Sequence, residues 1–249
     1  MEVHAHTHTP RKKWTHYFWE FLMLFLAVFC GFTAENIREH QIERKREKQY
    51  VQSLLQDLKQ DTTFLNFALG LHDKGCKMID TLILLLKSKD RNQSAGKIYF
   101  LARSIPFNDI PIVILDKTFD QLKSSGTLRL IHNVSILDSI SAYYGFYKFM
   151  SQAALPMEAR NRQEVFLGLE KLFDMKVFQD MAHSQNPLVP EFPLSEPTLL
   201  TNDEGIINSV CARYHFMYST RKVIQNETKR LNVAAKRLII LLKKEYHLN

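Results

Sequence analysis

Residues 15–34 read THYFWEFLMLFLAVFCGFTA, a stretch in which His16 and Glu20 are the only strongly polar side chains. A helix of this length measures about 30 Å at 1.5 Å per residue, which matches the hydrocarbon core of a bilayer. Trp14 adds an aromatic ring at one end, and residues 11–13 place three basic side chains just beyond it. Aromatic rings at the interface with basic residues outside them predict a retained transmembrane helix over residues 15–34.

Two other interpretations of this stretch stay open. Its uncharged part, residues 21–34, measures only about 21 Å, a length also found in signal peptides and in buried helices of soluble proteins. Signal peptidase favours small residues three places and one place before the bond that it cleaves. Cleavage after Ala34 would put Phe32 at the first of these places, so a retained helix is favoured.

One face of the predicted membrane helix carries small residues. Glu20, Ala27 and Ala34 are spaced seven apart, and Gly31 lies between them on the same side. Small residues let two membrane helices approach closely, because packing drives helix association in lipid. We therefore expect these four residues to form a helix-association face. The carboxylate of Glu20 either turns into the associated helices or reaches water at headgroup depth.

Residues 35–50 are strongly charged and contain neither proline nor glycine. Glutamates recur every four residues with arginine and lysine between them, and pairs such as Glu35 and Arg38 bring opposite charges together. A helix that is polar on all sides usually bridges solvent. We expect a helical stalk continuous with the membrane helix. The alternative, a basic patch on anionic lipid, is weakened by the glutamates.

The opening of the chain is similar to that of a known group of proteins. Residues 12–61 read KKWTHYFWEFLMLFLAVFCGFTAENIREHQIERKREKQYVQSLLQDLKQD. With its WEFLMLFLAV segment, its GF and AEN motifs and its YxxSLxxDL pattern, this stretch resembles the start of an uncharacterised family of single-pass membrane proteins from Gram-negative bacteria. The resemblance covers about a fifth of the chain. It implies a bacterial inner-membrane location and a helical C-terminal domain, and it implies no biochemical activity.

Residues 51–249 have the pattern of a helical domain, so the whole chain is predicted to be all-α. Glycine is scarce, with eight in the chain, and apolar residues recur at helical spacing. A break is expected at Gly70, a break or kink is expected at Pro156, and a long loop is expected over residues 183–204, which contain four prolines. Helices are predicted over residues 51–69, 72–88, 98–103, 112–123, 133–150, 158–181 and 204–246.

Histidines in the N-terminal tail are weak metal-ligand candidates. His4, His6 and His8 alternate in residues 1–14, which we expect to form a flexible, histidine-rich tail. Neutral imidazoles bind zinc, copper or nickel, but three ligands on a flexible chain bind weakly. The same pattern is typical of a disordered segment, which is the favoured interpretation.

The segment over residues 133–150 is rich in aromatic side chains, among them Tyr143, Tyr144 and Tyr147. Aromatic residues at helical spacing usually belong to a core, and the alternative is that these three line a ligand pocket. Cys211 and His215 stand four residues apart, as two ligands on one helix face would. Nothing in the sequence completes a ligand set for them, so we expect them to be core neighbours.

The net charge and the motif content of the sequence limit the classes of function that we expect. The net charge is +7, and the basic residues of the last helix lack the interleaved aromatics of a nucleic-acid site, so nucleic-acid binding is not expected. The sequence has no phosphate-binding glycine loop, nucleophile elbow or zinc-protease motif, and we predict neither an enzyme nor a bound cofactor.

The leading hypothesis is therefore a membrane-anchored, oligomeric scaffold or accessory protein whose helical domain docks a partner. One alternative is a membrane-bound sensor that binds a small ligand beside the aromatic helix, and another is a helical bundle that handles ions or metals. Three basic residues precede the membrane helix and five follow it within fifteen residues, a count that alone would place the C-terminal side in the cytoplasm. Because large C-terminal domains are translocated largely regardless of charge, we expect the short tail to stay inside and the C-terminal domain to be periplasmic.

Overall fold

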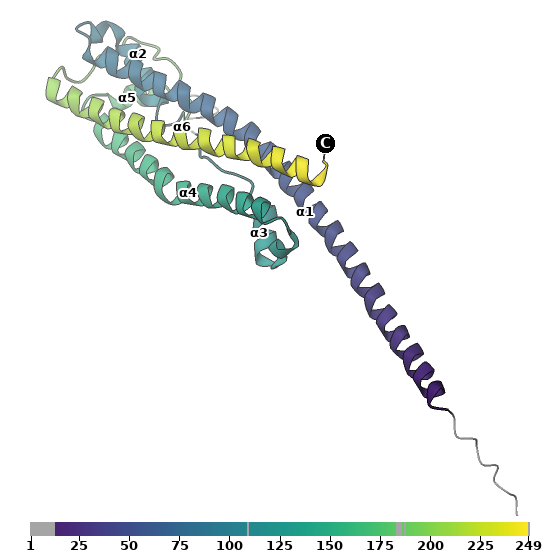
Figure 1. Cartoon of the computed structure of the whole chain (residues 1–249). Coiled ribbons are helices and arrows are strands. Elements are labelled where there is room, and N and C mark those ends of the chain that lie inside the picture. The colour runs from purple at the N-terminus through teal and green to yellow at the C-terminus, as the bar shows by residue number, and fades with distance from the viewer. Residues whose placement is uncertain (1–12, 109, 183–185, 187, 249) are drawn as a thin grey trace, which may run out of the picture. The chain divides into compact units, whose positions relative to one another are not determined.

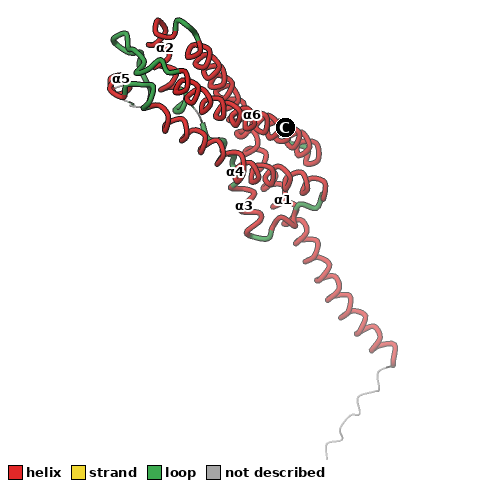
Figure 2. Tube along the Cα trace, turned by 90° about the vertical axis from the view of Figure 1, so that its left-hand side faces the viewer, coloured by secondary structure: helices red, strands yellow, loops and turns green. Residues whose placement is uncertain are grey.

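The computed structural model describes residues 13–108, 110–182, 186 and 188–248. Within these residues the chain consists of α-helices, two 3₁₀ turns and connecting loops, without a β-strand (Figure 1). Figure 2 shows the same helices with their connecting loops. The all-α prediction is confirmed. The tail that carries His4, His6 and His8 lies outside the described residues.

Helix α1 is Trp14–Lys87, a single helix of 74 residues. It contains the predicted membrane segment, the predicted stalk and the first two helices expected in the domain. The predicted break at Gly70 is wrong, because the helix continues through it. A glycine inside a helix costs only about 1 kcal/mol relative to alanine. Burial of Leu65, Ala68 and Cys76 on either side of Gly70 outweighs that cost.

The chain divides into two compact units, residues Met1–Gln49 and Tyr50–Asn249. In the described part of the first unit, the large apolar side chains are exposed almost without exception, among them Phe21, Phe25 and Phe32. One helix of the described chain, α1, is long and apolar enough to cross a membrane, and its apolar window lies near the N-terminus with none of it buried.

The second unit contains the remaining elements. These are η1 (Arg91–Ser94), α2 (Ala95–Ser104), α3 (Lys117–Ser124), η2 (Thr127–Leu130), α4 (Val134–Leu169), α5 (Met175–Asp180) and α6 (Glu204–Tyr246). Helices α4 and α6 run side by side (Figure 1). Helix α6 has the predicted bounds, and Asp203 caps it by accepting a hydrogen bond from the Ile206 N–H at 2.8 Å.

Helix α4 continues through Pro156, where a break or kink was expected, so the prediction of separate helices over residues 133–150 and 158–181 is wrong. Proline removes one hydrogen bond and usually bends a helix rather than ending it when packing holds both halves. A bend is visible in α4 in Figure 1. The helix ends at Leu169, and Asp174 caps the short α5 by accepting a hydrogen bond from the Lys176 N–H at 2.8 Å.

The predicted helix over residues 112–123 begins only at Lys117. Residues 111–116 have no regular secondary structure, and Ile112 and Ile114 are buried. Three β-branched residues in a row disfavour the helix and suit an extended backbone. Gly126 follows α3 with a φ of 68°, the left-handed conformation expected of a residue that ends a helix.

The core of the second unit consists of two hydrophobic clusters. One joins α2 and α5 to the C-terminal end of α1, the end of α4 and the start of α6. The other joins the 51–68 part of α1, residues 112–114 and α3 to the first half of α4 and the second half of α6. Along α1, α4 and α6 alike, polar residues separate the two clusters. These buried residues are His72, Glu158, Thr220 and Arg221; the buried polar residues Gln225 and Thr228 follow further along α6, beyond Ile224 of the second cluster.

Arg221 is the centre of this polar layer. Its side chain is fully buried, and its Nη2 atom lies 3.6 Å from Oε1 of Glu158. Oε2 of the same carboxylate accepts a hydrogen bond from Arg162 at 2.5 Å. Helix α1 passes the layer at Gly75, where a Cβ atom would lie 2.5 Å from Nη1 of Arg221. Glycine therefore gives the guanidinium group the space that it occupies.

We expect Gly75→Ala to lower the free energy of unfolding by about 1–3 kcal/mol, because the added methyl group displaces Arg221 from Glu158. Gly70→Ala in the same helix is the matched control, since a Cβ atom there meets nothing within 4 Å. The control should raise stability by about 0.5–1 kcal/mol. Urea unfolding of the full chain in detergent, followed by circular dichroism, measures both. Similar effects of the two substitutions would contradict the close approach at Gly75.

Candidate functional site

The three tyrosines that were candidate pocket residues form hydrogen bonds to α1 and to the loop of residues 111–116. Tyr143 and Tyr144 are buried, and Tyr147 is partly buried. Their hydroxyl groups donate hydrogen bonds, respectively, to Oδ2 of Asp61 at 2.7 Å, to the carbonyl oxygen of Leu115 at 3.3 Å and to that of Ile112 at 3.2 Å. These bonds tie α4 to α1 and to the irregular residues 111–116.

Asp61 is the polar centre of this contact. It is almost fully buried, and its Oδ1 accepts a hydrogen bond from the Leu115 N–H at 2.8 Å. Burial raises the pKa of Asp61 to about 6, against the lowering effect of the hydrogen bonds from Leu115 and Tyr143. Nearby Asp57 and Asp116 raise the pKa further. Burial also raises the pKa of Tyr143 far above its ordinary value, so its hydroxyl remains a donor.

A mostly apolar groove of about 700 Å³ adjoins Asp61. Phe67 and Val113 are exposed at this groove, and its size is within the range of small-molecule sites. The lining residues are Lys59, Gln60, Asp61, Thr63, Phe64, Phe67, Val113, Ile114 and Leu115. The three tyrosines lie behind residues 112–115 and do not line it.

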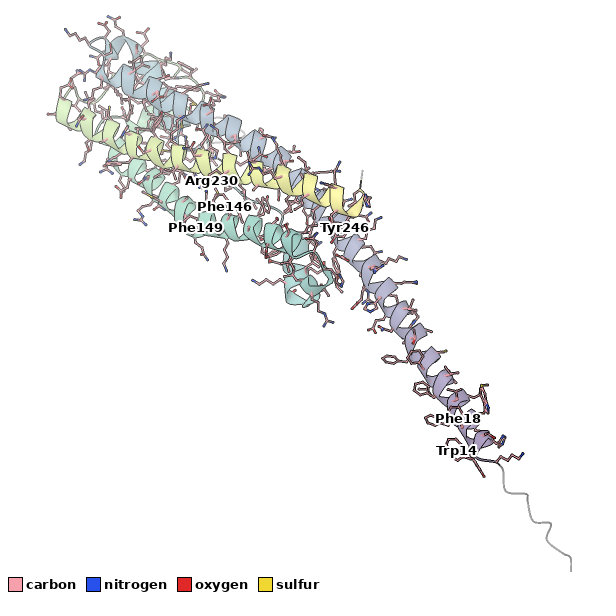
Figure 3. All side chains as sticks on the ribbon, viewed as in Figure 1. Trp14, Phe18, Phe146, Phe149, Arg230 and Tyr246 are labelled. Carbon is pink, nitrogen blue, oxygen red and sulfur yellow. The ribbon has the colours of Figure 1, made fainter. Side chains whose placement is uncertain are left out.

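A second groove, of about 470 Å³, lies between α4 and α6. Its lining combines apolar side chains with two arginines. The residues are Ser139, Ala142, Tyr143, Phe146, Arg230, Ala234, Arg237, Leu238 and Leu241. The Arg230 guanidinium carbon lies 5.1 Å from the centre of the Phe146 ring, and Figure 3 shows the two side chains between α4 and α6. This contact is a cation–π interaction across the two helices.

Exposed apolar residues extend this groove along both helices. Phe216, Val223, Arg230 and Arg237 are spaced seven apart on α6, which places them on one face. Phe149 is likewise seven residues after Ala142 on α4. The exposed fractions of Phe149, Phe216 and Val223 are 64%, 62% and 53%. We call the groove together with these three residues the α4–α6 seam.

The predicted helix-association residues lie in the first unit. Glu20, Ala27, Gly31 and Ala34 are all exposed on α1. Oε1 of Glu20 lies 3.0 Å from Nε2 of His16. A Cβ atom at Gly31 would meet nothing within 4 Å, so this position has space for contact with another helix.

The other ligand candidates are not brought together. Cys211 is buried as expected, but His215, four residues later, is exposed, so the prediction that both are core residues is wrong for His215. Cys76 and Cys211 are buried free thiols, and Cys30 is a free thiol exposed on α1. Among the described residues, no group of three His, Cys, Asp or Glu side chains has the arrangement of a metal site.

No protein-family model, curated protein or solved structure matches the chain. An enzyme family is therefore not identified.

Neither Asp61 nor the seam was predicted from the sequence. For the basic residues of α6, including Arg230 and Arg237, the sequence predicted only that they do not form a nucleic-acid site. A signal for the seam was present, because Phe216 and Val223 continue the seven-residue spacing of the two arginines toward the N-terminus. The role of Asp61 depends on Leu115 and Tyr143, which are distant in sequence, and no local signal predicts those contacts.

We expect the stability of the protein to rise as the pH falls from 7 to 5. Folded Asp61 has a pKa of about 6 against an ordinary value of 3.8, so the native state binds the proton more tightly than the unfolded state. The stabilisation from this group is fully present below pH 3.8 and is lost as the pH rises through about 6. Its full size is about 3 kcal/mol at most.

Asp61→Asn isolates this effect, because an amide keeps the acceptor for Leu115 and lacks the charge. The variant should lose the wild-type increase in stability between pH 7 and pH 5, measured by urea unfolding at each pH. Parallel pH profiles of the two proteins would show that Asp61 is not the titrating group.

Proposed function

We propose that this chain is a single-pass protein of the bacterial inner membrane that acts as an oligomeric scaffold or accessory subunit. In this proposal the second unit docks a partner protein and carries out no catalysis. The observation that carries the proposal is the α4–α6 seam. Exposed phenylalanines, such as Phe149, and arginines, such as Arg230, are residue types that are enriched at protein interfaces.

The first unit supports the membrane location. Exposure of an apolar surface to water costs about 25 cal/mol per Å², and soluble proteins rarely leave so many large apolar side chains uncovered on one helix. Lipid removes this cost for the exposed side chains of residues 15–34. The exposed small residues Ala27, Gly31 and Ala34 support self-association, because they allow close helix packing in lipid.

The seam favours docking over the two alternatives because it is a long exposed strip on two helices rather than an enclosed cavity. The small-ligand sensor and the ion-handling bundle stay predictions. The groove beside Phe67 is the feature that a small-ligand site would use.

We expect the full chain to remain in the membrane pellet after extraction with alkaline carbonate. A chain that lacks residues 1–49 should be released into the supernatant, because it lacks the exposed apolar segment. A reporter that is active only in the periplasm, fused after residue 249, should be active in the full chain. Release of the full chain by carbonate would contradict the anchor, and a reporter active only when cytoplasmic would contradict the orientation.

Docking at the seam predicts a site-specific cross-link in cells. A photoreactive benzoylphenylalanine in place of Phe149 should give a discrete adduct with another protein. The same group in place of Ile240, which is also exposed on α6, should give none. The adduct at Phe149 should be lost when Val223→Glu is added, since this change introduces a charge into the seam. Equal adducts at both positions, or none at Phe149, would contradict docking at the seam.

A further inference from the structure

Basic residues outnumber acidic residues on the α6 side of the α4–α6 seam. Between Lys222 and Lys244, beyond the buried Arg221, α6 carries seven lysine and arginine residues and one acidic residue, Glu227. Arg230 Nη1 contacts Oε2 of Glu227 at 2.8 Å, and the Arg230 side chain is still 69% exposed. The potential along the seam is therefore positive, and a partner with carboxylates is attracted to it.

The two seam arginines are placed to hold carboxylates at a fixed separation. Arg230 and Arg237 are seven residues apart on one helix, so their attachment points lie about 10.5 Å apart along its axis. The contact with Phe146 and the bond to Glu227 restrict the Arg230 side chain. An arginine restricted in this way loses little entropy when it binds a carboxylate through two parallel hydrogen bonds.

We propose that the α4–α6 seam binds an amphipathic α-helix of a partner protein, whose apolar face is bordered by carboxylates seven residues apart. The inference rests on the proposed docking function and names the chemistry of the partner. In this complex the partner's carboxylates pair with Arg230 and Arg237, and its apolar side chains enter the groove over Ala142 and Ala234.

A helix fits the seam better than a lipid surface does. The apolar side chains lie in a groove between two helices, and side chains that project from a third helix reach the floor of such a groove. A flat bilayer surface would contact only the outermost side chains of α4 and α6. The spacing of Arg230 and Arg237 also equals two turns of a helix, so glutamates seven residues apart on a helix face match it.

The size of the seam agrees with a short helix. On α6 it extends over residues 216–241, which is about 38 Å at 1.5 Å per residue. Phe149, Phe216 and Val223 provide exposed apolar contacts beyond the groove. A partner helix of about five turns would cover both arginines and at least Val223 and Phe149.

The test uses the full chain in nanodiscs of zwitterionic lipid and two designed 21-residue peptides. Both peptides form an amphipathic helix with a leucine face; glutamates border this face in one and lysines in the other. Binding is measured by fluorescence anisotropy, with empty nanodiscs as the blank. We expect the glutamate peptide to bind at least about ten-fold more tightly than the lysine peptide.

Two double variants locate the contact. Arg230→Glu with Arg237→Glu should weaken binding of the glutamate peptide at least about ten-fold and strengthen binding of the lysine peptide. Lys229→Glu with Lys236→Glu makes the same change of charge one position earlier, about 100° around α6, and should weaken binding less than about three-fold. Unchanged circular dichroism and melting temperature show that each variant is folded.

Several results would overturn the inference. Equal losses in the two double variants would indicate long-range attraction rather than contact at the seam. Equal binding of the two peptides would show that carboxylates are not selected. Competition by anionic vesicles that depends on Arg230 and Arg237 would make the seam a lipid site. If the cross-link at Phe149 persists in any of these cases, docking stands and only the chemistry of the partner is wrong.

Discussion

A buried ion pair in the middle of the bundle constrains the second unit more than any other contact. Arg221 is fully buried, and the Glu158 carboxylate compensates its charge. A buried charge that loses its partner is strongly destabilising, so α4 and α6 are held in the one register that keeps the pair together. Helix α1 fits this register because Gly75 leaves space for the guanidinium group. The two hydrophobic clusters pack on either side of this layer.

The register set by this layer also positions the seam. Because α4 and α6 are antiparallel neighbours, the alignment of Glu158 with Arg221 brings Phe146 opposite Arg230 further along the helices. Asp61 and the three tyrosines hold residues 111–116 against α1 and α4. Tyr143 belongs to both regions, because it also lines the groove of the seam.

The helices were predictable where local signals and packing agree. Helix α6 has its predicted bounds because a capping aspartate, Asp203, precedes a long apolar repeat. The break predicted at Gly70 was wrong, and Pro156 does not end α4, since local propensity costs less than the buried contacts on both sides of each residue. The irregular residues 111–116 depend on hydrogen bonds from α1 and α4. The arginines of the seam were visible in the sequence, but which side of α6 faces α4 is a property of the folded bundle.

The accessibility of the three free thiols depends on whether the chain is folded. Cys76 on α1 and Cys211 on α6 are buried, and burial raises the pKa of both thiols, which keeps them in the unreactive protonated form. Cys30 is exposed on the apolar segment, where lipid would shield it from water. With the proposed membrane insertion, a water-soluble alkylating reagent distinguishes three states of the chain: inserted and folded, extracted but folded, and unfolded, with none, one and three thiols modified.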